Sequence, residues 1–127
     1  MSVDATDLLT APDDATVEKA VRDYARAVRE AYRDRVKGIY LFGSRARGDH
    51  TAESDADVAV VLADGDWSVW DEKMRLADIE YDIIVGAGVE PQGWPVRQSE
   101  WNDPELHESP WLVRAMRRDA KAVEGVS

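Results

Sequence analysis

Apolar residues near the start of the chain follow a helical period. Between Thr10 and about Arg35 they recur every three or four positions, at Val17, Val21, Tyr24, Val28 and Ala31. This spacing places them on one face and predicts an amphipathic helix that packs on a core. Thr10 and Asp13 resemble a capping box at its start, and Pro12 suits a first helical turn.

Short apolar runs farther along the chain predict strands. Residues 36–42 (VKGIYLF) and 57–62 (DVAVVL) have the length and composition of buried strands. Residues 67–78 (WSVWDEKMRLAD) fit a short connecting helix. Residues 79–85 (IEYDIIV) then alternate as in a third strand, with Asp82 on the side opposite to the apolar set Ile79, Tyr81, Ile83 and Val85.

The stretch from 86 to 109 has the least regular pattern. Pro91 and Pro95 confine any strand here to a short segment or to a sheet edge. Ser109 and Pro110 open a last helix that is expected to run from Trp111 to about Val123. Three tryptophans could pack in the core or rim, or line a nucleoside pocket or a partner surface: Trp94, Trp101 and Trp111.

These elements predict an α+β domain with a small mixed β-sheet flanked by helices. The chain has 127 residues, enough for one domain with a real core. We expect this domain to span residues 12–127, after a mobile lead-in at residues 1–11.

Composition narrows the class of protein. The sequence has no cysteine, which excludes disulfides, thiol catalysis and cysteine-ligated zinc. No apolar run approaches the roughly 20 residues that span a bilayer, and the acidic start does not resemble a secretory signal. We therefore expect a cytoplasmic protein without membrane contact.

The charge balance is strongly acidic. The formal net charge is −10, which argues against broad nucleic-acid binding because that needs a basic surface. Many of the acids are aspartates, and four lysines accompany twelve arginines. This balance resembles the acidic surfaces of proteins from salt-loving organisms.

One segment, GSRARGDHTAESDAD (residues 43–57), concentrates the candidate chemistry. Gly43 follows a predicted strand and lets the backbone approach a ligand closely, and Ser44 has the chemistry to cap a short helix. Backbone N–H groups at such a turn bind phosphate oxygens well. Arg45 and Arg47 could add positive charge to a phosphate-binding turn.

The same segment ends in two paired acids. Asp55 and Asp57 point to one face of an extended chain, and such a pair is suited to Mg²⁺ with phosphate oxygens. Two Mg²⁺ ions could stabilise an in-line displacement. We expect Asp82 to supply a third acid, as a metal ligand or general base, with Glu80 as its competitor.

The motif resembles that of the DNA polymerase β nucleotidyltransferase superfamily, in its minimal nucleotidyltransferase (MNT) branch. That branch has Gly-Ser, ten residues, Asp-x-Asp and a third acid on a later strand. The match covers about Val36 to Gly86, with Gly43, Ser44, Asp55 and Asp57 aligned without insertion. Asp82 matches the third acid by position. The resemblance implies the polymerase β-type nucleotidyltransferase fold.

The resemblance also implies a function. Asp55, Asp57 and Asp82 would hold Mg²⁺, and Gly43 and Ser44 would hold the β and γ phosphates of ATP. Similar domains are commonly antitoxins that transfer AMP to a tyrosine of a partner HEPN ribonuclease toxin. Two alternatives stay open: an antitoxin that neutralises its toxin by docking alone, and a small-molecule nucleotidyltransferase of the aminoglycoside type. A homodimer and a hetero-oligomer are both compatible with the sequence.

Overall fold

The computed structural model describes residues 13–51 and 54–123. The lead-in expected at residues 1–11 lies outside this part of the chain. The elements follow in the order α2 (Asp14–Tyr32), η1 (Arg33–Arg35), β1 (Val36–Phe42), α3 (Ser44–Arg47), β2 (Ala56–Leu62), α4 (Val69–Ala87), β3 (Pro91–Arg97), α5 (Gln98–Asn102), η2 (Pro104–Leu106), α6 (Pro110–Asp119) and β4 (Lys121–Ala122).

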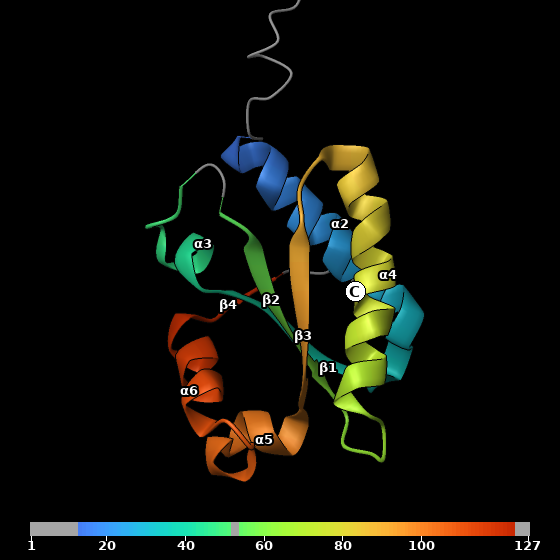
Figure 1. The fold of residues 1–127 in the computed structure, drawn as a ribbon, viewed down its shortest axis with the longest axis vertical. Helices are drawn as coiled ribbons and strands as arrows, with labels where there is room; N and C mark the ends of the chain where they lie inside the picture. The colour runs from blue at the N-terminus through green and yellow to red at the C-terminus, as the bar shows by residue number, and fades with distance from the viewer. Residues whose placement is uncertain (1–12, 52–53, 124–127) are drawn as a thin grey trace, which may run out of the picture.

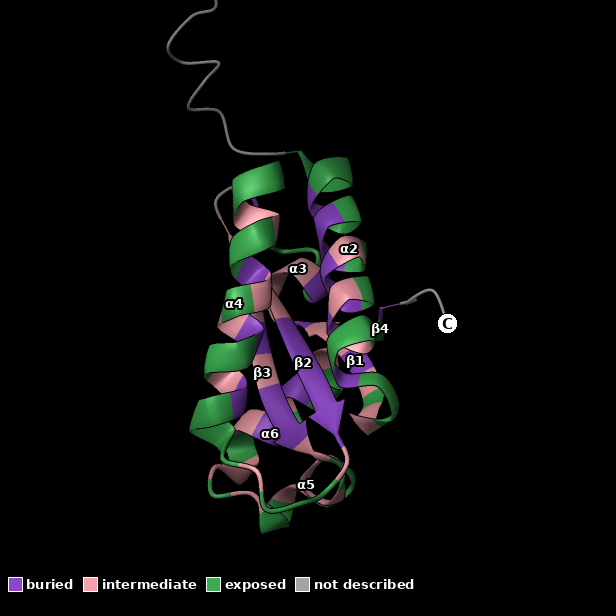
Figure 2. Cartoon of the chain, turned by 90° about the vertical axis from the view of Figure 1, so that its right-hand side faces the viewer, coloured by how far each residue is buried: buried purple, intermediate pink, exposed green. Residues whose placement is uncertain are grey.

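A four-stranded mixed sheet in the order β3-β2-β1-β4 forms the centre of the molecule (Figure 1). β1 pairs antiparallel with β2 and β4, whereas β3 pairs parallel with β2. Helices α2 and α4 lie side by side over one face (Figure 2), and α5 and α6 pack against the other. The predicted α+β class with a small mixed sheet flanked by helices is confirmed.

The alternation of side chains along β2 divides the core into two parts. Its even-numbered residues pack under α2 and α4, together with Tyr24, Val28 and Leu76. Ala59 points the other way and packs with Phe42 and the α6 residues Val113 and Met116. β2 is therefore covered on both faces, as its apolar sequence predicts.

The start of α2 differs from the expected capping box. The helix begins at Asp14, and its N-cap is Asp13, whose carboxylate accepts a hydrogen bond from the Thr16 N–H at 2.8 Å. Thr10 and Pro12 lie outside the described residues. Asp13 is a strong N-cap residue in its own right, which explains the later start.

The strand predicted at 79–85 is wrong, because these residues form the second half of α4. Ser68 caps this helix by accepting from the Asp71 N–H, and Gly88 ends it in the left-handed conformation. Ile79 and Ile83 are four residues apart, a spacing that puts them on one face of a helix as well as of a strand. In α4 both side chains pack against the core. No glycine or proline lies between Ser68 and Val85 to end the helix earlier.

The third strand is instead β3, which lies at the edge of the sheet as its prolines require. The last helix also differs in length. It begins at Pro110, with Ser109 as its N-cap, and ends at Asp119 because the chain then enters β4. No helix within residues 13–51 and 54–123 combines the length and the apolar character needed to cross a membrane.

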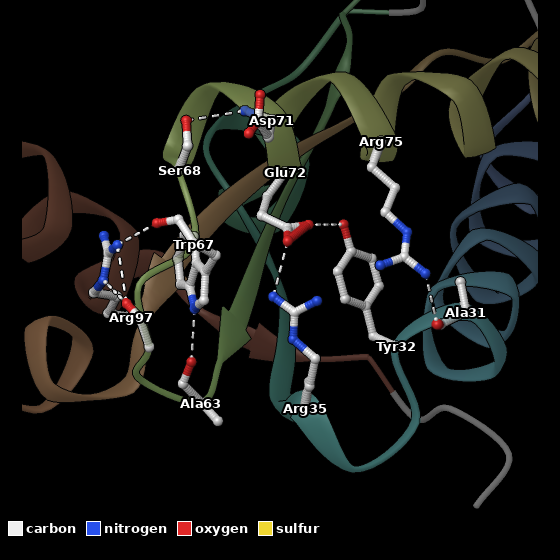
Figure 3. Close-up of polar contacts among 11 residues, drawn as sticks. Ala31, Tyr32, Arg35, Ala63, Trp67, Ser68, Asp71, Glu72, Arg75 and Arg97 are labelled. Atoms are coloured by element: carbon white, nitrogen blue, oxygen red, sulfur yellow. Dashed lines mark hydrogen bonds and ion pairs between the residues drawn. The ribbon is translucent and has the colours of Figure 1, made fainter.

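A buried carboxylate joins α2 to α4 (Figure 3). Glu72 on α4 is 7% exposed and accepts hydrogen bonds from the Tyr32 hydroxyl at 2.7 Å and from Arg35 Nη2 at 2.8 Å. Burial alone would raise the pKa of Glu72, but the hydrogen bonds from Arg35 and Tyr32 and the nearby cationic charges outweigh burial and lower it. Arg75 lies over the Tyr32 ring at 4.3 Å and donates to the Ala31 carbonyl.

This contact generates a prediction about stability. Tyr32→Phe removes one of the two hydrogen bonds to Glu72 while keeping the ring, so we expect the free energy of unfolding to fall by about 1–2 kcal/mol. Chemical denaturation measures the change. Tyr81→Phe, on the exposed face of α4, is the matched control and should cost less than about 0.5 kcal/mol. Equal losses for the two variants would contradict the assignment.

Candidate active site

The β1–β2 ladder brings the two halves of the 43–57 segment together at one end of the sheet (Figure 1). Phe42, the last residue of β1, pairs with Asp57 of β2, so the turn that follows β1 lies directly beside this acid. Gly43 occupies this turn with φ of 77°. A Cβ on Gly43 would lie 2.9 Å from Asp57 Oδ2. The turn and the carboxylate are thus in close contact, and only glycine permits it.

The short helix α3 starts from this turn. Its N-cap is Gly43, and Ser44 is its first residue, so the expectation that Ser44 caps it is wrong. The Gly43 carbonyl accepts from the N–H groups of Ala46 and Arg47. The first N–H groups of any helix have no acceptor within it, so those at the start of α3 suit an anion. Phosphate binding by Gly43 and Ser44 stays a prediction.

The two predicted acids are each held by a side chain of β3. Asp57 Oδ1 accepts from Trp94 Nε1 at 3.4 Å, and Asp55 Oδ2 accepts from Gln92 Nε2 at 3.1 Å. Gln92 is also the parallel-ladder partner of Asp57, so it lies beside this acid on the neighbouring strand. Sequence reasoning missed Gln92, because only the order of strands reveals that β3 borders the acids.

Several neighbours act on the pKa of Asp57, in both directions. Partial burial raises the pKa of Asp57, and the Asp55 charge raises it further. The Trp94 hydrogen bond and the Lys73 charge oppose this rise but do not cancel it. The paired carboxylates therefore lack full compensation from the protein, which is typical of a site that receives a cation.

Lys73 of α4 is the cation whose charge acts on Asp57. Sequence analysis did not identify this lysine. Its ammonium donates to the Gly93 carbonyl at 2.5 Å and lies 4.1 Å from the centroid of the Trp94 ring. Burial lowers the pKa of Lys73, against the charges of Glu80 and Asp57, which raise it. Lys73 thereby orients the tryptophan that holds Asp57.

The other two tryptophans have different environments. Trp101 stacks on Tyr40 with a centroid separation of 4.8 Å, on the α6 side of the sheet. Trp111 is 67% exposed. Of the three tryptophans left open by the sequence, Trp94 is the one that bonds to a predicted acid, Asp57.

Both arginines of the motif are engaged with groups of the protein. Arg45 donates to the carbonyls of Ser54 and Thr51 and to the Asp14 carboxylate. Arg47 donates to Asp119 at 2.8 Å and to Asp49 at 3.1 Å. Arg45 fixes the segment between α3 and β2, and Arg47 ties α3 to the end of α6. Their expected contact with phosphate stays untested.

The structure does not bring Asp82 to Asp55 and Asp57. Asp82 is an exposed residue of α4 and lines a cleft of about 260 Å³ between α2 and α4, together with Thr16, Lys19 and Asp23. In the described parts of the chain, no three His, Cys, Asp or Glu side chains are grouped as metal ligands. The expected grouping of three acids is therefore not found, because it required residues 79–85 to form a strand, and they form part of α4.

Glu80, the competing acid, is also elsewhere. It is 6% exposed, beneath α4, where its carboxylate accepts from the Gly93 N–H and lies near Lys73. Burial raises the pKa of Glu80 to about 7, although the Lys73 charge and the Gly93 hydrogen bond oppose the rise. One of its oxygens, Oε2, has no hydrogen-bond partner among the described residues.

The donor set fits one Mg²⁺ ion. Asp55 and Asp57 supply two carboxylates, and Mg²⁺ is commonly bound by one or two carboxylates with water and substrate phosphates completing its shell. The amide of Gln92 adds a neutral oxygen next to Asp55. A second ion would lack the third carboxylate that was expected for it.

Fold and site together define a domain of the kind that transfers nucleotidyl groups. A family model for the nucleotidyltransferase domain matches residues 21–115, and the chain belongs to this family. A Methanocaldococcus jannaschii protein, provisionally named a protein adenylyltransferase, is 35% identical over 85 residues, which cover 67% of this chain and 84% of that protein. The family resemblance inferred from the motif is confirmed.

Solved structures show the same fold. A provisionally assigned nucleotidyltransferase from Sulfolobus solfataricus gives a TM-score of 0.59 at 21% identity, over 85% of this chain and 79% of that chain. A toxin–antitoxin structure with AMP-PNP gives 0.53 at 18% identity, over 84% and 74%. At these identities the likeness concerns the fold.

The close contact of Gly43 with Asp57 can be tested separately from its backbone strain. Gly43 has φ of 77° and ψ of −158°, a conformation essentially confined to glycine, so Gly43→Ala is strained in any background. A Cβ at Gly43 would also meet the Asp57 carboxylate, which Asp57→Ala removes. We expect Gly43→Ala to lower the free energy of unfolding by at least about 1 kcal/mol more in the unmodified protein than in the Asp57→Ala variant. Equal costs in chemical denaturation would contradict the close contact.

The raised pKa of Glu80 predicts a pH-dependent stability. An acid with a folded pKa of about 7 against an ordinary 4.5 stabilises the protein fully below pH 4.5, and this contribution is lost as the pH rises to 7. Glu80→Gln keeps an acceptor for Gly93 but cannot ionise. Its stability relative to the unmodified protein should therefore increase by about 2–3 kcal/mol between pH 4.5 and 7. Glu30→Gln, on the exposed face of α2, should show no such trend in parallel urea titrations.

Proposed function

We propose that this protein transfers AMP from ATP to a hydroxyl group of a partner protein. The hydroxyl oxygen forms a bond to the α-phosphorus, the bond between the α- and β-phosphates breaks, and pyrophosphate leaves. The observation that carries the proposal is the contact of the Gly43 turn with Asp57, because a turn with backbone N–H groups suited to an anion then lies beside a pair of acids. The provisional name of the Methanocaldococcus jannaschii relative supports a protein as the acceptor. The AMP-PNP in the toxin–antitoxin structure of similar fold supports ATP as the donor.

Each residue has a defined part in this proposal. Asp55 and Asp57 would hold one Mg²⁺ ion, which would neutralise the carboxylates and phosphate oxygens during transfer. Gly43 and Ser44 would bind the terminal phosphates through backbone N–H groups. Gln92 and Trp94 orient the two acids through their hydrogen bonds, and Lys73 holds the Trp94 ring.

We further propose that the partner is a HEPN toxin and that the acceptor is one of its tyrosines. This assignment follows from the resemblance to antitoxins of HEPN/MNT pairs, and the toxin–antitoxin structures of similar fold support it. The distance of Asp82 from the acid pair favours a second candidate, in which the protein neutralises the toxin by docking alone. One set of variants separates the two.

The test incubates the protein with α-labelled ATP, Mg²⁺ and a candidate HEPN toxin, and measures the labelled AMP transferred to that toxin. Asp57→Asn should reduce labelling on the order of 100-fold or more, because the acid pair loses one of its charges. Asp66→Asn, at an exposed position between β2 and α4, is the matched control and should stay within about threefold. Labelling that survives Asp57→Asn would contradict transfer at this site. Protection of cells by an Asp55→Asn, Asp57→Asn double variant would favour docking alone.

A further inference from the structure

Exposed apolar side chains are concentrated on α4. Within the described residues, five of the seven large apolar side chains that are exposed belong to this helix. Four of them are Trp70, Met74, Tyr81 and Val85, and three of these four are at least 65% exposed. Figure 2 shows the outer side of α4 turned away from the sheet and from α2.

These four residues form one stripe along the helix. Their spacings of four, seven and four residues place them on the same face, because an α-helix has 3.6 residues per turn. The opposite face carries Glu72, Leu76 and Glu80, which are buried under the helix. A helix that is apolar on both sides is usually covered on both sides, and a rimmed apolar patch marks an interaction site.

An acidic row borders the stripe on the side of α2. Asp71, Asp78 and Asp82 are all exposed and lie on adjoining helical positions. Arg75, the cation nearest to them on α4, turns back toward α2, where it donates to the Ala31 carbonyl and covers the Tyr32 ring. The border of the stripe is therefore negative, in a protein whose net charge is −10.

The acidic border indicates which kind of molecule binds the apolar stripe of α4. If two copies of the chain paired through antiparallel α4 helices, a twofold axis would set each aspartate row against the other, and such like-charge contacts are costly. We propose that α4 is the docking surface for a different protein, which presents an apolar helix face bordered by arginine or lysine. The apolar stripe supplies the contact area and the aspartate row fixes the orientation.

The other border of the stripe leads to the candidate active site. Lys73 lies there and contacts Gly93 and Trp94 of β3, the strand whose side chains hold Asp55 and Asp57. A protein docked on α4 would therefore lie beside the acid pair. The link to transfer rests on the proposed function, whereas the docking itself is measured without nucleotide or metal.

The experiment uses two helical peptides as probes. Both carry leucines at helical spacing, and one has arginines and the other glutamates along one flank. Titration of the ¹⁵N-labelled full chain, followed by NMR, should show binding of the arginine peptide with shifts confined to α4. Trp70→Ser and Tyr81→Ser should each weaken binding at least about tenfold. Trp111→Ser, which removes an equally exposed tryptophan elsewhere, should leave binding unchanged.

A charge exchange completes the test. Asp78→Lys should lower the affinity for the arginine peptide and raise the affinity for the glutamate peptide, each by about threefold to tenfold. Equal affinity for both peptides, or shifts spread over the whole surface, would overturn the proposal. A dimer in sedimentation that Tyr81→Asp converts to a monomer would also overturn it, because the occupant would then be a second copy. Circular dichroism verifies that each variant is folded.

Discussion

The approach of the β1–α3 turn to the carboxylate of Asp57 is the constraint on which the candidate site depends. It requires β1 and β2 to pair in one register, with Phe42 opposite Asp57, and it requires a residue without a side chain at position 43. The sheet ladder fixes the register, and the covered faces of β2 prevent a slip, since a one-residue shift would turn Asp57 into the core. Folding the sheet and assembling the site are therefore one event.

The elements that depend on short apolar runs and local motifs could be predicted from the sequence. The 36–42 strand coincides with β1, and the Gly-Ser and Asp-x-Asp elements lie where the motif implies. The position of Asp82 could not be predicted, because the sequence from Ile79 to Val85 satisfies a strand period and a helix period equally. Gln92 and Lys73 reach the site through strand order and helix packing, which leave no mark in the local sequence.

Two buried acids on α4 show how local partners decide the behaviour of a carboxyl group. Glu72 and Glu80 lie two turns apart on the same buried face. Glu72 receives hydrogen bonds from a guanidinium and a phenol, and its pKa falls. Glu80 receives one backbone N–H and a more distant ammonium, and its pKa rises. The first anchors α4 as an ion, whereas the second can take up a proton near neutral pH.

The contacts of α4 with Gly93 have a further consequence for the outer edge of the sheet. The Glu90 carbonyl bonds to Ala56 of β2, so by alternation the backbone groups of residues 91, 93 and 95 face away from the sheet. Prolines at 91 and 95 have no N–H, and the N–H and carbonyl of Gly93 are taken by Glu80 and Lys73. An incoming strand would find no free donor along these three positions. The protein can thus expose β3 at an edge without offering a template for intermolecular β-sheet aggregation.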